Sequence, residues 1–233
     1  MENNTLYCAI TADIVDSKKM DTTQRFEIQN KLKQKLQESN NFYHAFLASK
    51  LDFSGGDRIQ ALFYSPIKAY EFFCLFRAEM DPIDFRFALG VGDWTIIMEN
   101  SGTNAQDGTS YHNAARAFEK AHKENKGIVF DSNSEGDIII NVLMENEDRL
   151  FKDQSQQQKK IALLLSNLLG DHDSKRVNYR QGIQKEIANL LHSSAQNISQ
   201  QIKRGKIYQQ RELQATILLF MEKYFFQEGW IRK

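Results

Sequence analysis

The sequence has few prolines and few cysteines, and neither sign of charge is in excess. With only two prolines, the chain has little material for long rigid linkers. Its two cysteines, Cys8 and Cys74, lie in apolar runs, which favours buried reduced thiols in a cytoplasmic protein over a disulfide scaffold. The formal net charge of +0 excludes a global basic field, so any surface that attracts nucleic acid must be local.

Long apolar runs are lacking as well. No run approaches the roughly 20 residues that span a bilayer, and the first residues lack the basic-then-apolar pattern of a signal peptide. We therefore expect no membrane partner. The apolar fraction of 41% is enough for a packed core, and the length of 233 residues predicts one or two domains.

The pattern of apolar residues predicts an α+β domain at the N-terminus. The predicted strands are residues 6–15, 48–53, 58–64 and 85–92, with a helix over residues 67–80. Another helix begins at Asp21–Gln24, where the residues match a capping box. The resulting β-α-β-β-α-β order is typical of a ferredoxin-like, or palm, sheet. We expect a third helix over residues 111–124, and a last pair of strands over residues 127–130 and 137–143.

The composition changes after Leu143. The stretch MENEDRLFKDQSQQQKK is polar and rich in glutamine, which indicates a boundary or the solvated start of a helix. Beyond it the apolar residues recur with helical periods. We therefore predict a palm domain over residues 1–150 and a helical domain over residues 151–233.

Two acids stand where predicted strands end. Asp13 closes the first strand, and Asp57 follows Gly55 and Gly56 in the turn of the predicted hairpin. In a palm sheet these elements are neighbours, so the two carboxylates would repel unless a cation neutralised them. Mg²⁺ or Mn²⁺ with a nucleoside triphosphate would suit such a site, and the glycines would let phosphates approach the backbone. Alternatively, Asp13 caps a strand end and Asp57 fills a turn.

Three motifs together resemble a known family. The segments ADIVDS, SGGDRIQALF and DGTSYHNAARAFEKA are similar in order and spacing to the catalytic core of class III nucleotidyl cyclases. The closer resemblance is to the small bacterial SatD family, over roughly residues 6 to 125. The resemblance implies that Asp13, Asp57 and the carbonyl of Ile14 bind the metal. Ser17 either hydrogen-bonds a phosphate or caps a turn.

The third motif carries the catalytic candidates that the resemblance implies. Arg116 matches the arginine that stabilises the transition state, which in cyclases comes from the other subunit of a homodimer. The asparagine of the cyclase motif falls on His112, and Asn113 is one position along; both are kept as candidates. The lysine and the acid that read the base fall on Phe53 and Ala105, so the base is not predicted.

The segment from residue 183 to residue 207 resembles a helix-turn-helix. Ile187 and Ala188 share one helical face, His192 stands where a turn glycine is usual, and Ser194 is placed to cap a second helix. Amide side chains in that helix could read adenine, and basic ones could contact phosphates. The candidate DNA-binding residues are Gln196, Asn197, Gln200, Lys203 and Arg204. The alternative is a helical hairpin used for packing or dimerisation.

Two functions follow from these features. One is a regulator in which a cyclase-like domain senses a Mg-nucleotide and a helix-turn-helix binds DNA. The other is an active nucleotidyl cyclase or nucleotidyltransferase whose helical domain serves dimerisation or partner binding. A purely structural dimer would be favoured if no metal bound. The substitutions at His112, Phe53 and Ala105 favour the regulator.

Overall fold

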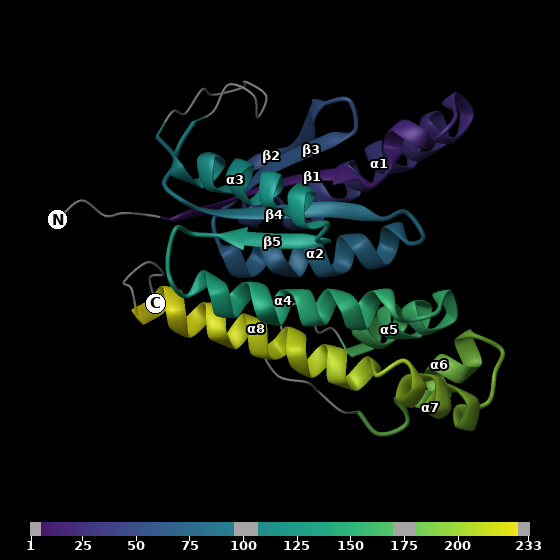
Figure 1. Ribbon diagram of the computed structural model, residues 1–233. Helices are drawn as coiled ribbons and strands as arrows, with labels where there is room; N and C mark the ends of the chain where they lie inside the picture. The colour runs from purple at the N-terminus through teal and green to yellow at the C-terminus, as the bar shows by residue number, and fades with distance from the viewer. Residues whose placement is uncertain (1–5, 96–106, 170–179, 228–233) are drawn as a thin grey trace.

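The computed structural model describes residues 6–95, 107–169 and 180–227, which form one five-stranded sheet with helices on both faces (Figure 1). The α+β class expected from the sequence is confirmed. The first elements are β1 (Tyr7–Ile14), η1 (Ser17–Lys19), α1 (Thr22–Tyr43), η2 (His44–Phe46), β2 (Leu47–Gly55), β3 (Arg58–Phe63), α2 (Pro66–Met80) and β4 (Phe85–Gly92). They are followed by α3 (Thr109–Glu124), β5 (Ile128–Asp131), α4 (Asp137–Lys152), α5 (Gln156–Leu169), α6 (Ile183–Leu190), α7 (Ala195–Arg204) and α8 (Ile207–Gln227).

The strand order across the sheet is β2-β3-β1-β4-β5. The central strand β1 is antiparallel to both β3 and β4, and β5 is parallel to β4. Side chains alternate along β1. Ile10 and Ala12 belong to the main core, which also holds the buried side chains of α1 and α2, whereas Ala9 packs against Ala114 of α3. The face of β1 that carries Asp13 is therefore the face covered by α3.

Local signals in the sequence explain how the first helices begin. Asp21 and Gln24 form the predicted capping box, in which each side chain accepts a hydrogen bond from the backbone N–H of the other residue. Ser65 caps α2, with Pro66 in the first turn. On the other side of the sheet, a Cβ at Gly90 would lie 2.0 Å from the backbone nitrogen of Ala114. Only glycine allows α3 to pack this closely on β4.

The strand predicted over residues 137–143 is wrong, because these residues form the start of α4. The buried residues Ile140, Met144 and Phe151 recur with a helical period, whereas Ile138 is 71% exposed. A short run of β-branched residues does not by itself distinguish a strand from a helix. The other strand of that predicted pair, over residues 127–130, is confirmed as β5.

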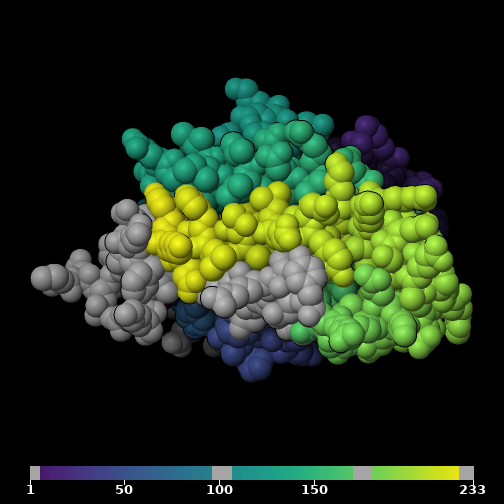
Figure 2. Space-filling model, turned by 90° about the horizontal axis from the view of Figure 1, so that it is seen from below, coloured from purple at the N-terminus to yellow at the C-terminus, as the bar shows by residue number. Residues whose placement is uncertain are grey.

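The helices after α4 contribute to two cores. Buried isoleucines of α5, α6 and α7 form a separate cluster. In contrast, Ile217, Met221 and Phe225 of α8 join the main core under the sheet. Figure 2 shows α8 in yellow alongside α4, with the α6–α7 region at one end of the molecule. The predicted division near residue 150 stays a prediction, and it falls within α4.

Two further expectations concern thiols and membranes. Cys8 and Cys74 are free, and burial raises the pKa of both thiols well above the ordinary value, so neither is a reactive thiolate at neutral pH. Across residues 6–95, 107–169 and 180–227, no helix combines the length and the apolar character needed to cross a bilayer.

Candidate functional site

Asp13 lies near the end of β1, on the sheet face that α3 covers. Its side chain is 17% exposed, and Oδ2 lies 3.1 Å from Nε2 of His122, in the last turn of α3. Arg86, the residue opposite Asp13 on β4, places Nη1 3.6 Å from Oδ1. That separation makes an ion pair but is too long for a hydrogen bond. Oδ1 is buried and has no hydrogen-bond partner in the described part of the chain.

The contacts of His122 with Arg86 and Asp13 indicate which of its ring nitrogens donates and which accepts. Nη1 of Arg86 lies 3.1 Å from Nδ1 of His122. Nη1 is also 3.2 Å from Nε2, but Nε2 faces the carboxylate of Asp13. Because arginine can only donate and a carboxylate can only accept, we assign Nδ1 as the acceptor and Nε2–H as the donor to Asp13. The chain thus supplies its own partners for this acid, in a relay from Arg86 through His122 to Asp13. Sequence reasoning missed both residues, although an arginine within the otherwise apolar strand FRFALGVG was a signal for Arg86.

Asp57 lies at the same end of the β1–β3 ladder as Asp13. Ala12 pairs with Ile59, so continuing this antiparallel register places Asp57 beside the last residue of β1, Ile14. Gly55 and Gly56 make the turn before it, and Gly56 has a φ of 60°, a left-handed conformation that suits glycine. Oδ2 of Asp57 is buried and accepts no hydrogen bond from any described residue. The structure therefore brings the two predicted acids to one end of the ladder.

Arg58 adds a positive charge next to Asp57. We call Asp13 and Asp57 the acid pair. Arg58 lies over the ring of Phe118 of α3, with its Cζ atom 4.8 Å from the ring centroid. The ring of Phe118 in turn meets that of His122 edge to face, at 4.9 Å. Ser17 lies beyond the end of β1, in η1, and is partly buried.

The predicted catalytic residues of α3 point in different directions. His112 is exposed and pairs with Asp107 at 3.0 Å. Asn113 is 6% exposed, and its Nδ2 donates to the carbonyl of Val91 at 2.7 Å. Asn113 therefore holds α3 on β4, a structural role that its one-residue offset from His112 explains.

Arg116 is bound within its own chain. Nε and Nη2 donate to the two carboxylate oxygens of Asp131 at 2.7 and 2.6 Å, and Nη2 also donates to Oδ1 of Asn113. The hydrogen bonds to Asp131 raise the pKa of Arg116 above its ordinary value. His122, the contact of Asp13, lies six residues further along α3, or about 9 Å along its axis. A single chain therefore does not bring Arg116 to the acid pair.

The C-terminal candidates lie on α7. His192 adopts a φ of 48°, the left-handed conformation for which a turn glycine is usual. Ser194 caps α7 by accepting a hydrogen bond from the backbone N–H of Asn197. The side chain of Asn197 is half-buried and donates to Ser193. The other candidates are exposed: Gln196, Gln200, Lys203 and Arg204.

Only some of the predicted site could hold a metal. No three residues among the described His, Cys, Asp and Glu side chains gather into a group suited to an ion. Asp13 and Asp57 each present a buried carboxylate oxygen that accepts no hydrogen bond from the described residues, and carboxylate oxygens are the ligands that a hard cation takes. Ala105, which stands where the cyclase resemblance places a base-reading acid, lies outside the described residues.

One family model matches a range that includes both halves of the chain. The model of the SatD family matches residues 7–219. The chain belongs to the SatD family. No curated protein matches it. The SatD match runs from β1 into α8, so the acid pair and the helix-turn-helix-like segment both lie inside one family pattern.

Proposed function

We propose that this SatD-family protein is a DNA-binding regulator whose N-terminal part binds a nucleoside triphosphate with Mg²⁺ or Mn²⁺. The observation that carries the proposal is the geometry of α6, the turn at His192 and α7. A left-handed turn residue, a serine cap and an exposed polar helix face occur together there. This combination is what a helix-turn-helix reader requires.

The face of α7 fits DNA in two ways. Gln196 and Gln200 are four residues apart and exposed, so they lie on one helical face and can reach base edges. Lys203 and Arg204 follow at the C-terminal end and would contact phosphates. Asn197 is half-buried and bonded to Ser193, so its role is to shape the turn rather than to read a base.

For the N-terminal part, we infer a ferredoxin-like unit formed by β1, α1, β2, β3, α2 and β4. The strand order β2-β3-β1-β4 and the antiparallel pairing of β1 with both neighbours support this topology. The residues that would hold a metal are Asp13, Asp57 and the carbonyl of Ile14. A bound cation would neutralise the two carboxylates and attract the phosphates of a nucleotide.

The contacts of Arg116 favour a regulator over an enzyme. Its guanidinium is held by Asp131 and Asn113, so using it as a transition-state residue would require breaking three hydrogen bonds. The alternative is a nucleotidyl cyclase or nucleotidyltransferase with a helical dimerisation module. It is favoured by the unpartnered oxygens of Asp13 and Asp57 and would require a homodimer to bring Arg116 to them.

The test is a fluorescence titration of the protein against DNA from upstream of its own gene, at several salt concentrations, with and without Mg-NTP. A dimer that contacts DNA through Lys203, Arg204 and Lys206 would neutralise about six phosphates and give a log–log salt slope of roughly −5. Changing Gln196 and Gln200 to Ala should remove sequence preference and keep the slope. Changing Lys203 and Arg204 to Ala should flatten the slope for all sequences alike.

A matched control is Gln209→Ala, which removes an exposed amide outside α7 and should change neither quantity. If no DNA binds even at low salt, the regulator proposal is wrong. If, in addition, an NTP is converted to product, the enzyme is the better description.

A further inference from the structure

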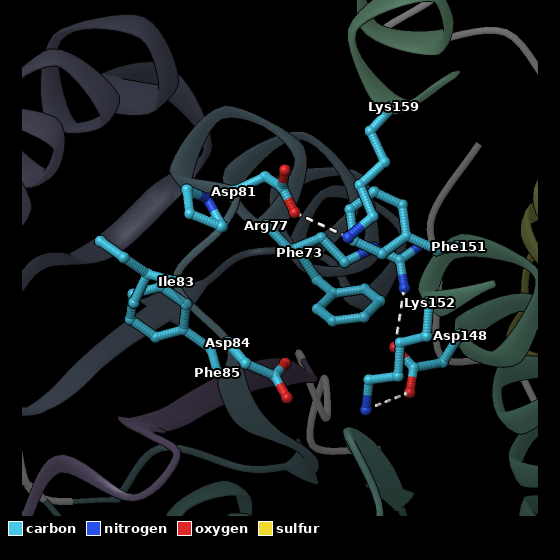
Figure 3. Close-up of a pocket in the computed structure, with 11 residues that line it drawn as sticks. Phe73, Arg77, Asp81, Ile83, Asp84, Phe85, Asp148, Phe151, Lys152 and Lys159 are labelled. Atoms are coloured by element: carbon cyan, nitrogen blue, oxygen red, sulfur yellow. Dashed lines mark hydrogen bonds and ion pairs between the residues drawn. The ribbon is translucent and has the colours of Figure 1, made fainter. Parts of the chain in front are cut away.

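A cavity of 190 Å³ lies where α2, α4 and α5 meet the start of β4 (Figure 3). Its apolar walls are the rings of Phe73, Phe85 and Phe151, with Ile83 beside them. Phe85 belongs to the main core, so the cavity lies on the face of the sheet opposite to Asp13. None of the metal-binding or DNA-binding residues proposed above lines it.

The charge of Arg77 at the cavity is paired within the protein. The guanidinium of Arg77 lies between two rings, 4.4 Å from the centroid of Phe73 and 4.2 Å from that of Phe151. Arg77 also donates to the carboxylates of Glu147 and Asp148. This arginine is 6% exposed, and both of its Nη groups are held by carboxylates, whereas its buried Nε donates to no described residue. Its charge is therefore already paired, and it shapes the cavity.

The ion pairs at the sides come from different parts of the chain. Nζ of Lys159, on α5, lies 2.7 Å from Oδ1 of Asp81, in the loop before β4. Nζ of Lys152, at the end of α4, lies 2.9 Å from Oδ2 of Asp148. In Figure 3 these two lysines approach the cavity from different directions. A ligand in the cavity would therefore contact α4, α5 and the α2–β4 loop at once.

One charge in the lining has no partner. Asp84 is exposed, and its carboxylate makes no ion pair or hydrogen bond with any residue that the structure describes. Lys152 is 42% exposed at the other side of the opening, and a pairing with the carboxylate of Asp148 leaves two of its three hydrogens for another acceptor. The opening thus offers one unpaired acceptor charge and one donor with spare capacity.

The volume limits what can enter. An engineered cavity of about 150 Å³ holds benzene, and pockets for drug-sized ligands begin at about 300 Å³. A cavity of 190 Å³ therefore takes an aliphatic or single aromatic group but excludes a nucleotide. The lining is mixed, with charged side chains beside the aromatic rings, so a ligand that suits it carries a small apolar group to lie against the rings and charged groups that remain at the opening.

From these features we infer that the cavity binds a small zwitterion of the amino-acid type. Its ammonium group pairs with Asp84, its carboxylate accepts from Lys152, and its apolar side chain enters between Phe85 and Phe151. The site is independent of the acid pair and of α7, and binding would join the sheet layer to α5, which packs against α7.

The test is a thermal-shift series on the full chain with each protein amino acid at about 10 mM, enough to occupy a site with a Kd of about 1 mM. We expect apolar amino acids to raise the Tm. For the best of them, isothermal titration should show that the N-acetyl derivative and the amide, which each lack one charge, bind at least ~10-fold more weakly.

Substitutions locate the site. Asp84→Asn should weaken binding at least ~10-fold and should fold normally, because the Asp84 carboxylate has no partner to lose among the described residues. Lys152→Met should weaken binding similarly. Asp153→Asn removes an exposed acid just beyond α4 that does not line the cavity and should leave affinity unchanged. The inference is overturned if no amino acid raises the Tm, or if Asp84→Asn binds as tightly as the unaltered chain.

Discussion

Asp13 and Asp57 are compensated differently by the surrounding protein. Each acid has a buried oxygen that accepts no hydrogen bond from the described residues, but Asp13 also lies against Arg86 and His122, whereas Asp57 makes no ion pair within the described part of the chain. Removing one member of a buried pair costs stability, because the remaining charge is left without its partner. Removing an uncompensated charge costs little.

Asp13→Asn and Asp57→Asn should therefore change the free energy of unfolding by different amounts. Without added metal, Asp13→Asn should lower the free energy of unfolding by about 1–3 kcal/mol, because Arg86 loses its counter-charge. Asp57→Asn should change it by less than about 0.5 kcal/mol or raise it. Urea denaturation at neutral pH with a chelator measures both. With Mg-NTP present, both variants should lose the ligand-induced rise in Tm, and a full rise in both would exclude the cation site.

His192 offers a second test at the level of one residue. A non-glycine residue in the left-handed region costs about 1–2 kcal/mol, part of which glycine returns through its freer unfolded state. His192→Gly should therefore raise the free energy of unfolding by up to about 1 kcal/mol. His112→Gly is the matched control, because His112 lies within α3 and the same replacement there should cost about 1 kcal/mol. Chemical denaturation that finds His192→Gly destabilising would contradict the assigned turn geometry.

Part of the candidate site was predictable from the sequence, and part was not. Asp13 and Asp57 could be found because each lies at a boundary that local patterns predict, namely a strand end and a glycine turn. Arg86 and His122 could not be paired with Asp13 in advance. The first contact depends on the register of β4 against β1, and the second depends on where α3 crosses the sheet. Both contacts depend on tertiary structure, which the spacing of residues along the chain does not predict.

At the scale of elements, α4 protects the edge of the sheet. β5 is an edge strand, and an unpaired edge invites pairing with another chain. Asn141 of α4 closes it, because its Oδ1 accepts from the N–H of Phe130 at 2.9 Å and its Nδ2 donates to the Phe130 carbonyl at 2.7 Å. One side chain thus takes the place of a neighbouring strand.

Asn141→Ala should then cost about 2–3 kcal/mol, since two backbone groups of β5 lose their partners. It should also increase aggregation as the protein concentration rises. Asn146→Ala is the control. Asn146 is exposed on the same helix and, among the residues that the structure describes, donates to the carbonyl of Val142 alone, so its loss should stay within about 0.5 kcal/mol. Unfolding curves and light scattering report the two effects, and equal values for the two variants would rule out the edge role of Asn141.

The elements also differ in how far the sequence predicted them. The start of α1 followed from its capping box, because this signal is local. α4 was mistaken for a strand, because residues 138–142 are β-branched apart from one asparagine and their helical period appears only when Met144 and Phe151 are included. Packing of this helix against β5 and α8 overrides the local preference.

At the scale of the whole molecule, a buried polar network joins segments that are distant in sequence. Oε1 of Glu147, a residue that is 0% exposed, accepts from Arg77 of α2 and from Gln210 and Gln214 of α8. Gln154 donates to Gln210 and to the carbonyl of Gly205, just after α7. Burial alone would lower the pKa of Arg77, but the surrounding groups, with Glu147 the strongest of them and Asp148 among the others, together raise that pKa. The network therefore connects α2 to α4 through ion pairs and α4 to α8 through hydrogen bonds from neutral glutamines.

This connectivity predicts that residues 1–152 will not fold as an independent unit, although they contain every strand that the structure describes. Ile217, Leu218, Met221 and Phe225 of α8 lie in the main core. Each buried side chain contributes about 1.5–3 kcal/mol, so losing the four would cost about 6–12 kcal/mol. That is comparable to the whole stability of a typical domain, about 5–15 kcal/mol.

The fragment 1–152 should accordingly show a broad, non-cooperative thermal transition and bind a hydrophobic dye, whereas the full chain should unfold in one step. A full-length Met221→Ala variant is the companion measurement. It keeps every helix and should lower the free energy of unfolding by about 2–5 kcal/mol, because it leaves a cavity beneath the sheet. If the fragment instead unfolds cooperatively near the Tm of the full chain, α8 is dispensable for the core. The boundary predicted near residue 150 would then separate two autonomous domains, and the fragment alone would suffice to test nucleotide binding.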